Sequence, residues 1–353
     1  MFSLEIQSST ENYEVIVGAR FTEVIPDYGA VIADEIFRNK LDMAVPIYWV
    51  TSSEQNKTLG TVESICAFLR EAGLTRSGRI LAIGGGVIQD LATLASSLYM
   101  RGVRWAYMPT TLTGMMDSCL GGKSSINVGA MKNLVGNIYP PERIYIDPSF
   151  IETLDRESID SGLAEGVKIA FARGNEAFTE FVDNASAENP GNDASTSSLI
   201  LHSLSCKKWF IEIDEFDKAE RQLLNFGHSF GHAFEAASNF GVQHGIGVAL
   251  GVLAATEHPL STSTPESERL AAYCRMLTSR HIDRIRSASQ ATDWSKFESS
   301  LRSDKKNSRE NLVLVLPKQP HQLARVEIPF DSGAVALARE VMQSTLTRLL
   351  AED

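Results

Sequence analysis

The chain lacks the features that mark secreted and membrane proteins. Its four cysteines are scattered and none stands in a CxxC pair, which favours free thiols over disulfides or a thiolate metal site. The N-terminus has no basic segment followed by an apolar core, so we expect no signal peptide. The longest apolar runs, such as IGVALGVLAA, are too short to span a bilayer. We therefore expect a cytoplasmic protein without a membrane partner.

Positive charge is also scarce. The sequence has 33 Lys and Arg residues against 44 Asp and Glu, a formal net charge of −11. Such a chain is poorly suited to binding nucleic acid, and an anionic ligand would need cations gathered locally. The remaining composition, 43% hydrophobic and 22% charged over 353 residues, is that of an ordinary globular protein of about two domains.

Strand and helix patterns alternate in the first part of the chain. Short β-branched runs such as YEVIVG, RILAIGGG and RIYIDP are separated by amphipathic stretches such as VESICAFLREAGL. This pattern is typical of βαβ units and a parallel sheet. After DPSFIETLD, long helical patterns dominate, among them ERQLLNFGHSFGHAFEAAS. We predict an α/β Rossmann-like domain over residues 1–148 and a mainly α-helical domain over residues 149–353.

One strand pattern leads through glycines into a helix, in ILAIGGGVIQD. Consecutive glycines let the backbone approach a pyrophosphate, and the following helix N-terminus favours negative charge. Asp34 ends another strand, where a carboxylate often accepts from ribose hydroxyls. Gln89 interrupts the G-x-G-x-x-G spacing, however, and the glycines could form only a tight turn. Glu54 and Lys57, after a third strand, could equally be solvated loop charges.

The most informative polar stretch is MPTTLTGMMDSCLGGKSSINVGAMKNLVGNIYPP. Lysines presented beside glycine turns suit a phosphate or carboxylate ligand. The alternative is a long surface loop, although such loops rarely carry so many small apolar residues. The polar residues of this stretch are Thr110, Thr111, Asp117, Ser118, Lys123, Asn127, Lys132 and Asn133.

Three of the seven histidines lie close together in LNFGHSFGHAFEAASNFGVQHG. His228 and His232 are one helical turn apart, and His244 begins a second helix that can return to them if the two helices pack antiparallel. Glu165 lies mid-helix in GLAEGVK, an expensive place for a carboxylate without a partner. Imidazole and carboxylate together suit Zn²⁺ with a position left for substrate. The spacing does not decide which three of these groups bind metal.

In this order the motifs resemble those of the 3-dehydroquinate synthase and sugar phosphate cyclase family. The resemblance covers about residues 30 to 315. It implies a Rossmann-like NAD domain followed by a helical metal domain, in a homodimer. The motifs that carry it are GGGVIQD, YMRGVRW, PTTL, MDSCLGGKSSIN, KNLVG, GLAEGVK, RQLLNFGHSFGHAFE, HG and DKKN.

The resemblance also implies roles for individual residues. Glu165, His228 and His244 would bind a divalent metal, zinc or cobalt. His232 would instead face the substrate phosphate, together with Asn225, Lys123, Asn133 and a lysine of Lys305–Lys306. The implied catalytic residues are Lys123, Lys168, Asn225, His232, Lys305 and Lys306. The implied substrate-binding residues are Asn133, Arg101 (reaching in from the partner subunit), and Lys207 with Arg221, which would hold a carboxylate. The implied NAD-binding residues are Asp34, Glu54, Lys57, Gly85, Gly86, Asp90, Thr110, Thr111, Asp117, Lys132 and Thr153.

The implied activity is conversion of 3-deoxy-arabino-heptulosonate 7-phosphate, a phosphorylated sugar acid, to 3-dehydroquinate and phosphate in the shikimate pathway of aromatic amino acid biosynthesis. A ring hydroxyl is oxidised by NAD⁺, phosphate is eliminated, the ketone is reduced again, and an intramolecular aldol closes the carbocycle. The metal would polarise the hydroxyl and NAD would supply the hydride chemistry. The leaving phosphate can itself act as the base.

Some positions depart from the family pattern. Gln89 stands where Gly is usual, Gly166 where an apolar residue is usual, HGI replaces HGE, and SCLGGKSSIN replaces the commonest form. None is an implied ligand, but they leave open a specialised cyclase acting on an amino analogue or on sedoheptulose 7-phosphate. Lys207 and Arg221 favour a substrate with a carboxylate, unless they only form salt bridges with neighbouring acidic residues.

Two other classes also remain open. A metal-dependent glycerol or alcohol dehydrogenase shares the two-domain plan but would not need so many cations around one anion. A catalytically inactive NAD-binding protein would retain the nucleotide site alone. NADH accumulation separates them, since a dehydrogenase accumulates it, a cyclase releases phosphate without it, and an inactive protein does neither.

Overall fold

The computed structural model describes residues 2–41, 44–129, 131–187, 193–303, 307, 310–319 and 322–351. The chain forms two units. Unit 1 comprises Met1–Leu154 and Pro190–Phe216, and unit 2 comprises Asp155–Asn189 and Asp217–Asp353. The sequence predicted one boundary, after residue 148. The chain instead leaves unit 1 after Leu154 and returns to it later, because helix α6 (Asp193–Ile213) packs on the π-helical turn η5 (Gly114–Ser118).

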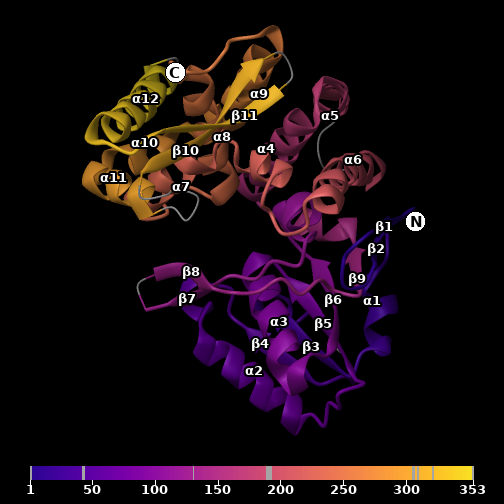
Figure 1. The fold of residues 1–353 in the computed structure, drawn as a ribbon. Coiled ribbons are helices and arrows are strands. Elements are labelled where there is room, and N and C mark those ends of the chain that lie inside the picture. Colours follow the sequence, from indigo (N-terminus) through magenta and orange to yellow (C-terminus); the bar gives the residue numbers. More distant parts are fainter. Residues whose placement is uncertain are drawn as a thin grey trace. The chain divides into compact units, whose positions relative to one another are not determined.

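Unit 1 is built on a mainly parallel sheet, whose elements can be followed in Figure 1. The strands run in the order β1-β2-β9-β6-β5-β3-β4, and β1 alone is antiparallel to its neighbour within this described sheet. The strands predicted at YEVIVG, RILAIGGG and RIYIDP are β2, β5 and β9. Strand β1 and the β7–β8 hairpin were not predicted. The bounds are β1 Phe2–Ile6, β2 Tyr13–Val17, α1 Phe21–Val24, β3 Ala30–Asp34, β4 Ile47–Val50, α2 Leu59–Glu71, β5 Arg79–Gly84, α3 Gly86–Leu98, β6 Arg104–Pro109, β7 Ile126–Val128, β8 Met131–Val135 and β9 Arg143–Ile146.

The direction in which strands are added to the sheet reverses at β3. Strand β4 pairs with one side of β3, and β5, the next strand in the chain, pairs with the other side. All five residues of β3 are buried, as expected of a strand covered on both faces. In open α/β sheets, ligands bind outside the carboxyl ends of the strands at such a reversal. Asp34 and Gly84–Gly86 lie at the carboxyl ends of β3 and β5.

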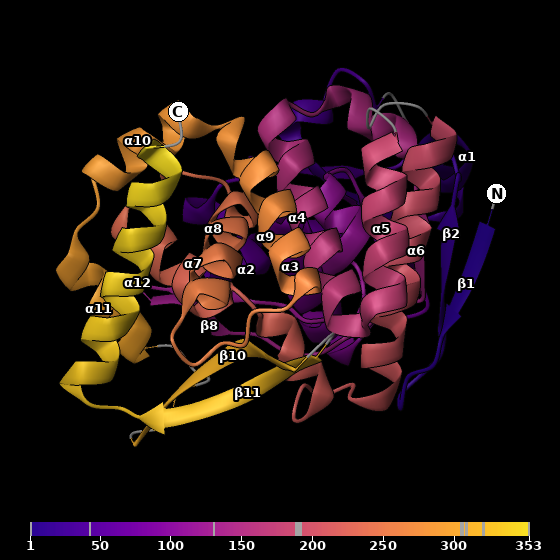
Figure 2. The ribbon, with the colours of Figure 1, turned by 90° about the horizontal axis from the view of Figure 1, so that it is seen from above.

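Unit 2 is mainly helical, as predicted. Helix α8 is buried from Gly245 to Ala255 and lies between α7 and α9, as Figure 2 also shows. Strands β10 and β11 pair as an antiparallel hairpin that was not predicted. None of the described helices is long and apolar enough to cross a membrane. The bounds are α4 Arg156–Arg173, α5 Asn175–Ala187, α7 His228–Ala237, α8 His244–Glu257, α9 Pro265–Ser279, α10 Ile282–Gln290, α11 Trp294–Ser303, β10 Asn311–Gln319, β11 Gln322–Pro329 and α12 Ser332–Ala351.

Helices α7 and α8 cross with their backbones in close approach at glycines. A Cβ on Gly231 would lie 2.7 Å from the Gly247 carbonyl oxygen, and one on Gly251 would lie 1.9 Å from the Gly227 oxygen. This pairing makes the two helices antiparallel, which is the arrangement that brings His244 back toward the histidines of α7.

The single helix expected over residues 220–238 is wrong in one respect. Gly227 has a φ of +78°, which separates the 3₁₀ turn η7 (Glu220–Asn225) from α7. A side chain at Gly227 would also meet the Val248 oxygen of α8 at 2.8 Å. The break is therefore set by the close approach of α8, which a helix-period pattern does not reveal.

We expect Gly251→Ala to lower the free energy of unfolding by about 1–3 kcal/mol or more, because a methyl group must push the crossing helices apart. Urea or thermal unfolding measures the loss. Gly60→Ala is the control, since its Cβ would meet only Thr58 Oγ1, at 3.7 Å, on helix α2. Equal unfolding midpoints for the two variants would contradict the tight crossing.

Candidate active site

A cavity of 160 Å³ lies at the carboxyl ends of β3, β5 and β6. Gly86 begins α3, and a Cβ there would meet nothing within 4 Å, so the helix N-terminus stays open to a ligand. A helix N-terminus free of side chains suits a pyrophosphate, and a carboxylate at the neighbouring strand end suits a ribose. The residues present therefore fit NAD. The predicted NAD-binding residues that line this cavity are Asp34, Gly85, Gly86, Thr110, Thr111 and Thr153.

A second group of predicted residues forms a polar cluster around Lys57. The Lys57 ammonium lies 3.0 Å from Asp90 Oδ2 and donates to Asn133 Oδ1 at 2.7 Å. Lys132 Nζ lies 3.4 Å from Glu54 Oε2. Burial raises the pKa of Asp90 to about 6 although Lys57 opposes that shift. The cluster ties the β7–β8 hairpin to helix α3, and it brings Asn133, predicted to contact phosphate, beside predicted NAD-binding residues.

Asp117 lies apart from both groups, in η5. Lys207 Nζ of helix α6 lies 2.5 Å from Asp117 Oδ1. Lys207, predicted to hold a substrate carboxylate, thus has an acidic partner that the sequence analysis did not foresee. Gln89 Nε2 donates to the Ser118 carbonyl oxygen at 2.6 Å, and Ser118 Oγ donates back to Gln89 Oε1 at 2.8 Å. Gln89, the departure from the family pattern, therefore fixes the turn that carries Asp117.

Arg101 and Lys123 are exposed residues of unit 1. Arg101 ends the turn η4 (Tyr99–Arg101), where Met100 and Arg101 have φ values of 48° and 66°. Such backbone strain in non-glycine residues is often retained at functional sites. The Arg101 side chain is exposed at the surface of unit 1.

The centre of unit 2 is the carboxylate of Glu165 on helix α4. The side chain has no exposed surface, and Lys168, one turn along the helix, forms an ion pair with its Oε2 atom. The other oxygen, Oε1, is buried and has no hydrogen-bond partner of acceptable geometry among the described residues. A buried acceptor without a donor is costly, which makes Oε1 a candidate ligand for a cation.

Two imidazoles face that oxygen. His244 Nε2 lies 3.2 Å and His228 Nε2 lies 3.8 Å from Glu165 Oε1. The opposite nitrogen of each ring is occupied, since His228 Nδ1 lies 3.2 Å from the Phe226 carbonyl oxygen and His244 Nδ1 lies 3.1 Å from Glu235 Oε1. Both rings therefore present Nε2 to Glu165. Ligands about 2.1 Å from a tetrahedral Zn²⁺ stand about 3.4 Å apart, so these spacings fit a divalent metal.

His232 also belongs to the cluster. One ligand atom from each of His228, His232 and His244 lies within 4.8 Å of the others, and His232 is the exposed residue of α7 among them. The geometry thus brings together all four groups that the sequence singled out. The 3.2 Å and 3.8 Å spacings fit Glu165, His228 and His244 as a ligand set, while the ring of His232 lies 4.9 Å and 5.3 Å from the rings of His228 and His244, measured between centroids.

The charges of this centre favour a cation. Burial would raise the pKa of Glu165, but Lys168 and the two histidines outweigh it and hold that pKa well below its usual range. Burial would lower the pKa of His244, but Glu235 and Glu165 outweigh it and raise that pKa well above its usual range. Glu165 is therefore ionised at neutral pH, and a divalent metal would replace the proton of His244.

Two further predicted residues of unit 2 lie just before the histidines in the sequence. Arg221 and Asn225 lie in η7, and Arg221 is 4% exposed. Asn225 lines a cavity of 300 Å³ together with Ser229 and Arg325, a cation that the sequence analysis missed. Lys305 and Lys306 lie outside the described residues.

The sequence analysis missed three residues around His244, two that bind the backbone on either side of it and one that contacts its ring. Glu157 Oε1 accepts from Gln243 N at 3.0 Å, and Ser161 Oγ accepts from Gly245 N at 2.8 Å. Glu235 contacts the His244 ring itself. The available signal was the presence of acidic residues on helix faces that are otherwise apolar, which is expensive without a partner.

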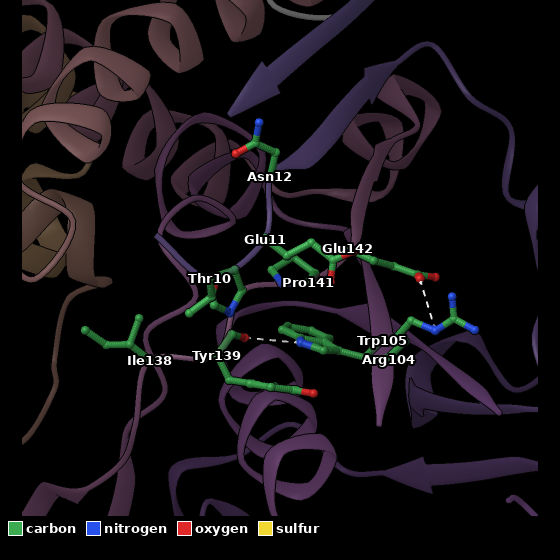
Figure 3. A pocket seen from close by; sticks show the side chains of 10 residues that line it. Thr10, Glu11, Asn12, Arg104, Trp105, Ile138, Tyr139, Pro141 and Glu142 are labelled. Atoms are coloured by element: carbon green, nitrogen blue, oxygen red, sulfur yellow. Dashed lines mark hydrogen bonds and ion pairs between the residues drawn. The ribbon is translucent and has the colours of Figure 1, made fainter. Parts of the chain in front are cut away.

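A further cavity, of 190 Å³, lies beside β6 in unit 1 (Figure 3). Trp105 Nε1 donates to the Tyr139 carbonyl oxygen at 3.2 Å, and Arg104 Nε lies 3.9 Å from Glu142 Oε2. No predicted site residue lines it. Because these polar groups are satisfied by one another, we do not assign this cavity to the active site.

The fold is shared with sugar phosphate cyclases. A 2-deoxy-scyllo-inosose synthase, solved with carbaglucose-6-phosphate, NAD⁺ and Co²⁺, superposes with a TM-score of 0.78 at 22% identity, covering 97% of this chain and 99% of that one. A 2-epi-5-epi-valiolone synthase from Streptomyces hygroscopicus, solved with NAD⁺ and Zn²⁺, gives 0.75 at 22% identity, covering 98% and 99%. A probable glycerol dehydrogenase from Sinorhizobium meliloti gives 0.58 at 11% identity, covering 95% and 96%.

Sequence comparison gives the family. Residues 47–161 match the 3-dehydroquinate synthase N-terminal domain and residues 162–307 match the C-terminal domain. The chain belongs to the 3-dehydroquinate synthase family. It is 37% identical to the 3-dehydroquinate synthase of Clostridium tetani over 62% of its own length and 60% of that protein, and 41% identical to that of Streptococcus sanguinis over 57% and 56%. The match thus spans about 60% of the length of such curated relatives.

Proposed function

We propose that the protein is an NAD- and metal-dependent phosphate lyase that forms a carbocycle, converting 3-deoxy-arabino-heptulosonate 7-phosphate to 3-dehydroquinate and phosphate. The observation that carries this proposal is the family match over residues 47–307, which contains the histidine–carboxylate centre and most of the residues that line the cavity at the sheet, although not Asp34. The proposal includes a place in the shikimate pathway, a cytoplasmic location, and a homodimer to which Arg101 contributes across the interface.

The reaction needs a hydride acceptor that is regenerated and a group that acidifies a ring hydroxyl, which bound NAD and a bound zinc or cobalt ion would supply. The Rossmann-like cavity would hold NAD. Glu165, His228 and His244 would hold the metal. Lys168 forms an ion pair with Glu165 Oε2 and thereby keeps Oε1 directed at the two Nε2 atoms.

The substrate's two anionic groups would be bound by separate sets of polar residues. His232 and Asn225, both near the metal ligands in the chain, would contact the phosphate together with Lys123, Asn133 and a lysine of the pair Lys305–Lys306. Arg221 and Lys207 would hold the carboxylate. Binding the departing phosphate in place would let it serve as the base for its own elimination, so the chain needs no dedicated general base.

Two alternatives differ in the substrate. A specialised cyclase would act on an amino analogue or on sedoheptulose 7-phosphate, and the fold is shared with a 2-deoxy-scyllo-inosose synthase and a 2-epi-5-epi-valiolone synthase. A glycerol or alcohol dehydrogenase shares the fold less closely, with a TM-score of 0.58. The buried cation Arg221 favours a substrate with a carboxylate, the heptulosonate phosphate or its amino analogue, over sedoheptulose 7-phosphate and over a simple alcohol.

NAD⁺ should act catalytically. With heptulosonate phosphate as substrate, we expect phosphate release to exceed the added NAD⁺ many times over with no net NADH, because each oxidation is reversed within the same turnover. Phosphate assay and NADH absorbance on one sample measure both quantities. One NADH formed per product would contradict the lyase and support the dehydrogenase.

A further inference from the structure

Glu235 is a buried carboxylate that none of the proposed roles uses. It lies on α7, one turn beyond His232, and is 8% exposed. Its Oε1 lies 3.1 Å and its Oε2 lies 3.4 Å from His244 Nδ1. A carboxylate in such an apolar helix face is expensive unless it is paired, so its position beside a candidate metal ligand calls for a function.

The opposite helix leaves a place for this carboxylate. A Cβ on Gly247 of α8 would lie 2.6 Å from Glu235 Oε1 and 2.8 Å from its Cγ. Any larger residue at this position would therefore displace Glu235 from the His244 ring. Gly247 is one turn from His244, so the same stretch of α8 presents the imidazole and accommodates its partner.

The backbone of His244 is fixed independently. The amides on either side of His244, those of Gln243 and Gly245, donate to Glu157 and Ser161 of α4, the helix that carries Glu165. These contacts fix the position of the His244 backbone, but they do not fix the rotation of the imidazole ring about its side-chain bonds. Glu235 fixes the rotation and the tautomer, because its bond to Nδ1 leaves Nε2 facing Glu165 Oε1 at 3.2 Å.

We propose that Glu235 is a positioning residue for the metal centre, acting on the metal through His244. The inference rests on the proposed function only for the presence of a metal. A carboxylate that accepts from the far nitrogen of a histidine ligand orients the ring and increases its basicity. His228 has a neutral carbonyl in the corresponding place, that of Phe226. The two proposed histidine ligands thus differ in the partner of Nδ1, a carboxylate for His244 and a backbone carbonyl for His228.

The test is metal affinity, measured without turnover by competing Zn²⁺ or Co²⁺ against a chelator. Loss of such a partner typically weakens metal binding about 10–100-fold, and we expect this of Glu235→Gln. Gly247→Ala keeps the carboxylate but fills its place, so it should weaken metal binding in the same direction. The visible spectrum of bound Co²⁺ should shift in both variants, since the orientation of one ligand changes.

Glu257→Gln is the matched control. Glu257 ends α8, the helix that begins with His244, and accepts from Thr345 Oγ1 and Arg348, with no histidine among these partners. Its metal affinity should equal that of the wild type. Circular dichroism must show that each variant is folded. If Glu235→Gln is not folded, the metal affinities of Gly247→Ala and Glu235→Asp test the inference instead.

Three results overturn the inference. If folded Glu235→Gln bound metal with the affinity of the wild type, the contact between Glu235 and His244 would have no effect on metal binding. If Glu235→Gln lost metal binding as completely as His244→Ala, Glu235 would itself be a metal ligand. If the wild-type protein bound no metal, the proposed metal site of Glu165, His228 and His244 would be refuted, and the role of Glu235 with it. In contrast, a wild type that binds metal but releases no phosphate would refute the proposed function and leave the role of Glu235 intact.

Discussion

His228→Ala should abolish metal binding and lower kcat by about 10³-fold or more, since a metal's stabilisation of developing charge is worth several kcal/mol. The wild type should contain about one divalent ion per chain by elemental analysis. His228 Nε2 lies 3.8 Å from the buried Glu165 Oε1, so the variant loses one of the groups positioned around that oxygen. Affinity for NAD should change little, because the residues proposed to bind it belong to unit 1.

Two comparisons sharpen this expectation. His202→Ala alters a histidine of helix α6 in unit 1 and should leave the metal content unchanged. His232→Ala should retain metal while losing activity, because that imidazole is proposed to contact the substrate phosphate. Full metal occupancy in His228→Ala, or an empty site in His232→Ala, would reassign the ligands to a different set of the clustered histidines.

Arg221→Ala should lower kcat/KM for heptulosonate phosphate by roughly 10²-fold or more, the loss of a charge-assisted contact worth about 2–5 kcal/mol. Arg221 is 4% exposed, and a buried guanidinium that contacts an anionic substrate is difficult to replace by water. Arg221→Lys should recover part of the loss because it retains the charge but not the planar fork. Steady-state kinetics on folded variants measure each effect.

The control is Arg286→Ala, which removes a surface cation paired with Asp283 one turn away and should be nearly neutral. A second experiment compares sedoheptulose 7-phosphate with heptulosonate phosphate as the substrate of the wild-type enzyme. It has a hydroxymethyl group where the heptulosonate has its carboxylate, so the wild type should use it poorly. A preference for sedoheptulose 7-phosphate, or a neutral Arg221→Ala, would refute the carboxylate assignment and favour a specialised cyclase.

The sequence predicted the parallel strands of unit 1 because hydrophobic periodicity carries that information locally, but it missed β1 and the hairpins β7–β8 and β10–β11. It could not assign α6 to unit 1, because a helical pattern shows which residues are buried but not which of the two units they are buried in. The break at Gly227 was missed for a related reason. Its cause is the backbone of α8, which lies beyond any local pattern.

The candidate site was predicted unevenly. Histidines spaced by one turn are conspicuous. All three cluster within unit 2, and two of them, His228 and His244, face Glu165. Glu235 and Ser161 were missed because an isolated acidic or hydroxyl residue has no distinctive spacing, and its role depends on a partner distant in sequence. The individual roles in NAD, metal and substrate binding remain predictions.

The return of α6 to unit 1 has a consequence for biosynthesis. Unit 1 ends at Phe216, after the whole of Asp155–Asn189 has already been made as part of unit 2. Domains generally fold as units, the N-terminal one first, as the chain leaves the ribosome. Here all strands of the N-terminal sheet precede Leu154, but the unit still lacks α6, whose Ser203 hydroxyl donates to the Met116 carbonyl oxygen of η5 at 2.9 Å. A ribosome that stalls shortly after Leu154 would therefore present a sheet whose η5 turn is not yet covered by α6 rather than a finished domain.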